Sequence, residues 1–83
     1  MQQDYVIFNP EFGSYASFVN NECWVGWEFT GLLEADGFTD VARAQQRIDG
    51  LILPSGRVLI EAAEELKGCV VRRRSIMIEV EDI

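Results

Sequence analysis

The sequence predicts a single α+β domain over residues 1–83. We expect an antiparallel β-sheet, made of a three-stranded N-terminal meander plus a C-terminal strand, with one or two helices packed on one face. The first thirty residues are rich in aromatic and β-branched side chains, interrupted by turn residues. Residues 41–48 space their apolar side chains as a helix does, and the chain then ends on an alternating run. Strands followed by helices and a closing strand are typical of a helix-on-sheet layout.

The meander contains three β-prone runs, at residues 5–8, 15–19 and 23–30. The turn between the first two holds Pro10, which presets one backbone angle, and Gly13, which permits a positive φ. In the third run Cys23, Val25, Trp27 and Phe29 share one parity, and we expect them to face the core. Trp24, Gly26, Glu28 and Thr30 share the other parity and therefore lie on the opposite face of the sheet.

A helix is predicted after a connection at residues 31–37, in which 32–35 form a short helical turn. Thr39 is the expected N-cap, with Asp40 placed favourably at the positive end of the helix. Val41, Ala44 and Ile48 recur at helical spacing, and residue 50 is a glycine that ends the helix.

Residues 51–67 admit two interpretations. A hairpin with its turn at residues 54–56 is one of them; a second helix, capped by Ser55, is the other. The stripe formed by Val58, Leu59, Ala62 and Leu66 favours a helix over 57–67, although residues 51–60 remain open between strand and helix. A final strand is predicted over 69–81.

Charge is distributed unevenly along the chain. Residues 1–42 hold seven acids and no Lys or Arg, whereas residues 43–83 hold seven acids and seven bases, so the net charge of −7 belongs to the first half. All nine aromatic residues also lie there, between Tyr5 and Phe38. Acids steer a basic partner while Tyr and Trp supply contact area, so this half favours binding to a cationic protein surface. Direct binding to nucleic acid or to an anionic membrane is disfavoured.

No motif in the chain indicates a reaction. There is no His, no G-x-S-x-G, no C-x-x-C and no phosphate-binding glycine spacing. We expect no catalytic residue, no cofactor and no metal. Cys23 and Cys69 are most simply reduced thiols, although their spacing leaves a disulfide open. With no secretory signal and no long apolar run, a soluble cytoplasmic protein is expected.

The only run of like charge is Arg72, Arg73 and Arg74. In a strand Arg73 faces opposite to the other two, so the run does not form one dense patch. A phosphate or RNA contact is one interpretation. The favoured one is pairing with carboxylates of the acidic half, such as Glu28, together with protection of a sheet edge.

The predicted partner-binding surface lies on the sheet face that the helix leaves uncovered, with Trp24 beside Glu28 and either Tyr5 or Tyr15. The alternative is that the aromatics only fill the core and the acids are only solvated. The candidate partner-binding residues are Glu11, Glu22, Trp24, Glu28, Glu34, Asp36 and Asp40.

A resemblance covers about half of the chain. The run Tyr-Val-Ile-Phe-Asn at 5–9, followed by Tyr15, Trp24, Leu-Leu-Glu-Ala at 32–35, Phe-Thr-Asp at 38–40, Ala44 and Ile48, resembles a layout common in small bacteriophage proteins. Its landmarks are core and cap residues, so it concerns the fold rather than an activity. The acidic character resembles that of anti-CRISPR proteins, several of which present carboxylates where a CRISPR effector complex binds DNA.

The resemblance implies a phage-encoded inhibitor, acting in the cytoplasm of the host bacterium as a DNA mimic. It would bind a basic, nucleic-acid-handling surface of a CRISPR effector complex and block DNA binding. The alternative is a structural or regulatory accessory domain of a phage or mobile element, which self-associates through its open sheet face. The chain is accordingly expected to be a monomer or a homodimer.

Overall fold

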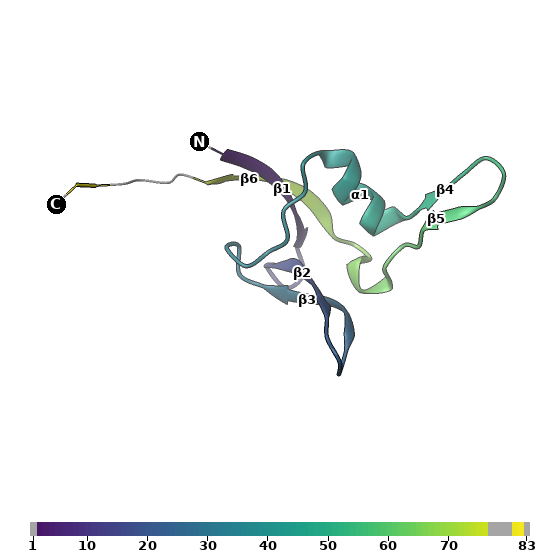
Figure 1. Ribbon diagram of the computed structural model, residues 1–83, viewed down its shortest axis with the longest axis horizontal. Coiled ribbons are helices and arrows are strands. Elements are labelled where there is room, and N and C mark those ends of the chain that lie inside the picture. The colour runs from purple at the N-terminus through teal and green to yellow at the C-terminus, as the bar shows by residue number, and fades with distance from the viewer. Residues whose placement is uncertain (1, 77–80, 83) are drawn as a thin grey trace.

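The computed structural model describes residues 2–76 and 81–82, and it confirms the α+β layout (Figure 1). A four-stranded antiparallel sheet has the strand order β3-β2-β1-β6, with a single α-helix and a separate two-stranded hairpin. The elements are β1 (Gln2–Asn9), β2 (Ser14–Asn20), β3 (Val25–Thr30), α1 (Val41–Asp49), β4 (Leu51–Ile52), β5 (Val58–Ile60), the 3-10 turn η1 (Glu64–Leu66) and β6 (Val70–Ile76). Within the described residues no helix is long and apolar enough to cross a bilayer.

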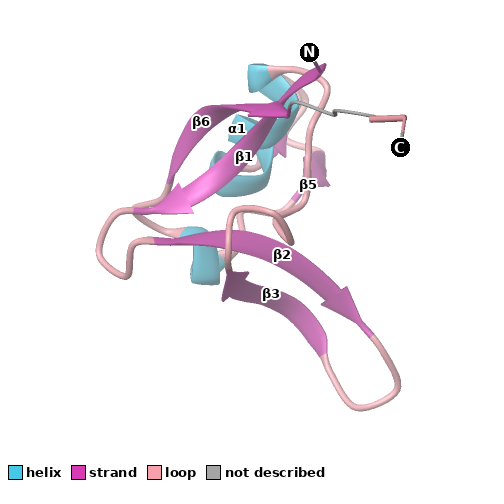
Figure 2. Cartoon of the chain, turned by 90° about the vertical axis from the view of Figure 1, so that its left-hand side faces the viewer, coloured by secondary structure: helices cyan, strands magenta, loops and turns pink. Residues whose placement is uncertain are grey.

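The sheet consists of two ribbons that meet at one corner. β1 pairs with β6 from Gln2↔Ile76 to Phe8↔Val70, and β2 pairs with β3 along its whole length. β1 and β2 pair only next to their turn, at Phe8↔Tyr15 and Asn9↔Ser14. Beyond that corner the two ribbons diverge, as Figure 2 shows.

The connection after β3 fills the space between the diverging strands. Phe38 exchanges two backbone hydrogen bonds with Tyr5 of β1, at 2.8 and 3.0 Å. Asp36 donates its backbone N–H to the carbonyl oxygen of Ala16, and its Oδ2 accepts the backbone N–H of Phe18 at 2.7 Å. These bonds satisfy backbone groups that a continuous β1–β2 ladder would otherwise pair.

Arg74 ties this connection to the sheet. Its guanidinium forms a bidentate pair with Asp4, the residue opposite it on β1, with N–H···O distances of 2.9 and 2.6 Å. The same guanidinium donates to the carbonyl oxygens of Leu32 and Ala35 at 2.7 and 3.0 Å. Only 8% of the Arg74 side chain is exposed. A Cβ on Gly37 would collide with both charged groups, so glycine is required there by the close approach.

The predicted pairing with a carboxylate of the acidic half is confirmed for Arg74, but the example given, Glu28, was wrong. Arg74 pairs with Asp4 and not with Glu28, because β6 lies beside β1, whereas β1 and β2 separate β6 from Glu28 on β3. β6 is an edge strand of the sheet, as the edge-protecting interpretation requires. Arg73 is exposed and has the opposite parity to Arg72 and Arg74.

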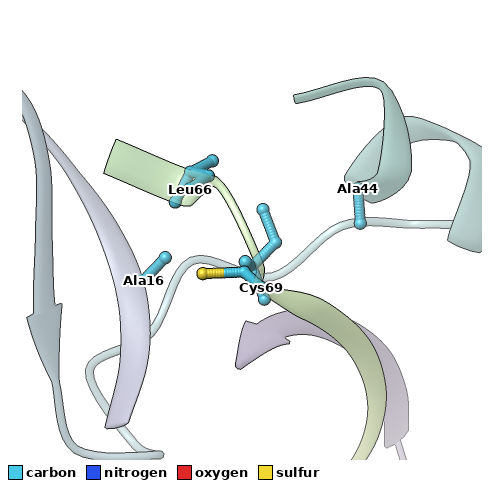
Figure 3. Close-up of a cluster of buried hydrophobic side chains, with 5 residues drawn as sticks. Ala16, Ala44, Leu66 and Cys69 are labelled. Carbon is cyan, nitrogen blue, oxygen red and sulfur yellow. The ribbon is translucent and has the colours of Figure 1, made fainter. Parts of the chain in front are cut away.

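The main hydrophobic cluster is small and lies on one face of the sheet, under α1 and η1, while Val6, of opposite parity to Ile7, is buried on the other face. Figure 3 shows its centre, where Ala16, Ala44, Leu66 and Cys69 meet; Ile7 completes the buried set. Burial raises the pKa of the Cys69 thiol. Cys69 and Cys23 are both free thiols, and Cys23 is exposed in the β2–β3 turn.

The predicted C-terminal end of α1 is confirmed, whereas its predicted N-cap was wrong. Gly50 ends the helix as predicted, with φ of +82° and its N–H bonded to the carbonyl oxygen of Gln46. The predicted N-cap was wrong by one residue: Asp40, not Thr39, adopts the extended cap conformation, and its Oδ1 accepts the N–H of Arg43 at 2.8 Å. Asp outranks Thr as a cap, which explains the shift.

The predicted second helix over 57–67 was wrong. Residues 51–60 form the β4–β5 hairpin, whose turn is closed by the bond from Leu53 N–H to the Arg57 carbonyl oxygen at 2.8 Å, and Gly56 has φ of +90°. β-branched Val58 and Ile60 favour strand, and only Glu64–Leu66 forms a helical turn. Two other boundaries differ. β3 begins at Val25 rather than at 23, and β6 ends at Ile76; the predicted continuation through 77–80 lies outside the described residues.

Replacing Arg74 by Met tests the buried ion pair. We expect the free energy of unfolding to fall by about 3 kcal/mol, because the change removes four hydrogen bonds made by one charged group. Asp4→Asn should cost less, about 1 kcal/mol, since the guanidinium keeps both carbonyl partners. Urea unfolding measures both. Exposed Arg73→Gln is the matched control, and equal losses in Arg74→Met and Arg73→Gln would contradict the assignment.

The same pair predicts an acid dependence of stability. The hydrogen bond from Arg74 lowers the pKa of Asp4, against the opposing effect of partial burial. A carboxylate with a lowered folded pKa contributes its full stability above its unfolded pKa of about 4, and loses it as the pH falls through the folded value. The stability difference between wild type and Asp4→Asn should therefore be constant near neutral pH and shrink below about pH 4. Urea titrations at a series of pH values measure this difference, and a gap that widens in acid would refute it.

Candidate functional site

The most distinctive surface feature is the outer half of the β2–β3 hairpin, residues 18–27, which we call the arm. Figure 2 shows it extending away from the rest of the sheet. Its strands pair with each other from Phe18↔Trp27 to Asn20↔Val25. At its base, the Asp36 carboxylate holds the N–H of Phe18, and Oε2 of Glu65 lies 3.4 Å from the backbone nitrogen of Trp27. The arm is therefore anchored at its base, and beyond the base its two strands form hydrogen bonds only with each other among the described residues.

The turn at the tip of the arm is built by Asn21. Its Oδ1 accepts the backbone N–H groups of Cys23 at 2.9 Å and Trp24 at 2.8 Å, and its own N–H bonds to the carbonyl oxygen of Trp24. Asn is suited to such turns because its short side chain mimics a backbone acceptor. The turn presents Glu22 and Trp24 at the end of the hairpin.

Aromatic side chains cover both faces of the arm. On the face away from the core, the Trp24 indole lies over Gly26, where a Cβ would stand only 2.7 Å from the ring. On the core-side face, Phe18 and Trp27 pack edge to face with centroids 5.3 Å apart. Trp27 contacts the core, as the alternation predicted. Val25 shares its parity but is 59% exposed, because the arm has left the core by that point.

The arm combines exposed apolar side chains with acids. Phe18 is 46% exposed and Trp24 42%, and Glu22 and Glu28, which follows the arm on β3, are exposed as well. No Lys or Arg occurs within residues 18–28. Large exposed apolar groups that cluster on one element are typical of protein-binding surfaces, and the acids favour a cationic partner.

A row of side chains crosses the sheet at the other end of β2, on the face opposite the core. The Arg72 guanidinium lies 3.7 Å from the centroid of the Phe8 ring, a cation–π contact, and Phe8 packs against Tyr15 with centroids 5.0 Å apart. Tyr15, rather than Tyr5, is thus the tyrosine on this face. The row places one cation, Arg72, on the sheet face that also carries Trp24 and Glu28.

The predicted partner-binding residues do not form one patch. Glu22, Trp24 and Glu28 lie on the arm or directly at its base. Glu11 is in the turn before β2, at the other end of a seven-residue strand and so about 20 Å from Glu22. Glu34 lies in the connection after β3, with its carboxylate folded back over Gly31.

Asp36 and Asp40 have structural partners. Asp36 is half-buried and bonded to the N–H of Phe18, and Asp40 caps α1 while pairing with Arg43 at 3.5 Å. Whether any of the seven predicted residues binds a partner remains a prediction; Glu22, Trp24 and Glu28 are the ones that lie on the same hairpin, on the arm or next to its base.

Sequence reasoning missed Phe18 as a surface residue and Arg72 as a member of the opposite face. Strand parity gives no signal for the exposure of Phe18, because Phe18 pairs with Trp27 on the core-side face and is exposed only because the arm leaves the core. The contact of Arg72 with Phe8 depends on β6 lying beside β1, which the sequence did not indicate. Among the described residues no group of three His, Cys, Asp or Glu side chains is arranged to hold a metal ion.

Comparison with known proteins adds no relative: no protein-family model, curated protein or solved structure matches this chain. Its function therefore has to be argued from its own residues.

Proposed function

We propose that this chain is a non-enzymatic protein-binding domain that inserts its acidic, aromatic arm into a basic surface of a partner. In its specific form it is an inhibitor of the anti-CRISPR type. It would occupy a nucleic-acid-handling surface of a CRISPR effector complex and block the binding of DNA.

One observation carries the proposal: the arm projects from the sheet with Phe18 and Trp24 exposed, with Glu22 at its tip and Glu28 next to its base, and residues 18–28 hold no Lys or Arg. The aromatic side chains of the arm are partly exposed to water, so covering them with a partner makes the free energy of binding more favourable. Trp is enriched among the residues that dominate binding energy, and carboxylates around it speed the approach of a cationic surface.

The position of the arm also supports its role. The bond from Phe18 to Asp36 and the contact of Trp27 with the core hold its base, so its tip is presented on a supported stem. A preorganised element loses less conformational entropy on binding than a free loop does. Arg72 lies on the sheet face beyond the base of the arm and leaves the acidic tip unneutralised.

Substitutions on the arm test this function with a purified CRISPR effector complex and its target DNA. Trp24→Ala should weaken binding by at least about 30-fold, the effect expected of a binding hot spot. Glu28→Lys should weaken it by about tenfold, more at low salt than at high salt. Inhibition of DNA binding in a gel-shift assay and affinity by calorimetry provide the readouts.

The matched control is Glu64→Lys on η1, an exposed acid outside residues 18–28. It should leave both binding and stability unchanged. Absence of any inhibition, or binding that is insensitive to salt and to both arm substitutions, would refute the proposed function.

Self-association is the second candidate, and one observation favours it. On the sheet face opposite the core, Phe8, Tyr15 and Val70 form an adjoining apolar strip, and Val70 is 43% exposed. A second copy of the chain could cover this strip together with Trp24, with the acids serving only solubility.

Light scattering distinguishes the two candidates. A homodimer would have twice the 9.4 kDa mass of the chain, and Trp24→Ala should return it to the monomer. A monomer at high protein concentration would eliminate self-association and would be compatible with binding of a basic partner.

A further inference from the structure

A cleft opens at the base of the arm, on the core side of the sheet. Its volume is about 630 Å³, within the range of pockets that hold a ligand or a large side chain. Phe18 and Trp27 of the arm form one wall, and Phe38 of the connection another. The chain from Leu59 to Ala63, which leaves β5, closes the opposite side together with α1.

The polar groups of the cleft are two acids and one base. Asp36 is half-buried; its Oδ2 holds the N–H of Phe18, while no described residue donates to its Oδ1. Glu61 is exposed and makes no ion pair with any residue of 2–76 or 81–82. Arg47 of α1 is the single cation in the lining.

We propose that this cleft binds one Arg or Lys side chain of the partner that the arm engages. The inference rests on the proposed function and names the group that the partner supplies. Three aromatic side chains line the cleft, and an aromatic ring attracts a cation to its face; the carboxylates of Asp36 and Glu61 offer acceptors. Apolar walls such as Leu59 suit the methylene stem of a long cationic side chain.

The neighbouring surface restricts the ligand to a single cation. A smaller hollow of about 330 Å³ adjoins the cleft, shares Phe38, Arg47 and Ile60 with it, and adds Arg43. Arg43 is paired with Asp40, so the guanidinium of Arg47 is the group on that side that repels further positive charge. The cleft therefore selects an isolated cation from the partner over a run of consecutive basic residues.

Small-molecule probes test the cleft without a partner. Trp24→Phe leaves Trp27, which lines the cleft, as the sole tryptophan and therefore as the fluorescent reporter. The probes are N-acetyl-arginine amide, its uncharged isostere N-acetyl-citrulline amide, and N-acetyl-glutamate amide. We expect a saturable change in Trp27 emission with the arginine probe, with a Kd of about 1 mM. The other two probes should bind at least about tenfold more weakly.

Charge substitutions fix the sign of the interaction. Glu61→Gln should weaken binding of the arginine probe about fivefold, while the control Glu64→Gln should leave its binding unchanged. Arg47→Gln should strengthen binding of the arginine probe by a similar factor, with exposed Arg57→Gln as the control. Asp36 is left intact because it holds the base of the arm. Circular dichroism verifies that each variant is folded.

Three results would overturn the proposal: equal binding of arginine and citrulline probes, preference for the glutamate probe with loss of binding in Arg47→Gln, or no saturable response to any probe. Failure here is distinguishable from failure of the proposed function. Partner binding that still depends on Trp24 while the probes do not bind refutes the cleft alone. Probe binding without any Trp24-dependent partner refutes the arm alone.

Discussion

The fold depends on one buried guanidinium. Arg74 reaches from the last strand to Asp4 on the first and to two carbonyl oxygens of the connection after β3. It therefore joins both ends of the chain to its middle in a protein whose hydrophobic core is small. Breaking such a pair leaves charged and polar groups without partners in a partly buried place, and this penalty exceeds the net gain from forming it. Asp4 and Arg74 lie so close to Gly37 that a Cβ at this position would collide with both side chains.

The same arrangement exposes the arm. Because Arg74 fixes the connection, Asp36 and Phe38 occupy the space between β1 and β2, and the β2–β3 ribbon is directed away from the sheet. The arm then carries aromatic groups on both faces, with Trp24 on one side and the cleft beside Phe18 on the other. The ion pair and the candidate binding surfaces are thus linked through backbone hydrogen bonds.

Local sequence signals predicted the first fifty residues well and the next seventeen poorly. Alternation placed Trp27 in the core and Trp24 on the other face, and Gly50 ended the helix. The stripe through Val58 and Leu66 suggested a helix, yet a β-branched run after a turn glycine forms a strand. Periodicity does not separate the two states in a short apolar segment, so pairing with β4 decides the outcome.

The sequence by itself determined the antiparallel meander, the helix that Gly50 ends, and the excess of acids in the aromatic half, because these follow from side-chain alternation, spacing and composition. Tertiary structure alone decided which acids are free and which are used. Asp4 was one of fourteen acids in the sequence, and only the placement of β6 beside β1 makes it the partner of Arg74. Likewise Asp36 became an anchor of the arm, whereas Glu22 and Glu28 stayed exposed. Contacts between residues far apart in the chain depend on strand order, which local patterns do not encode.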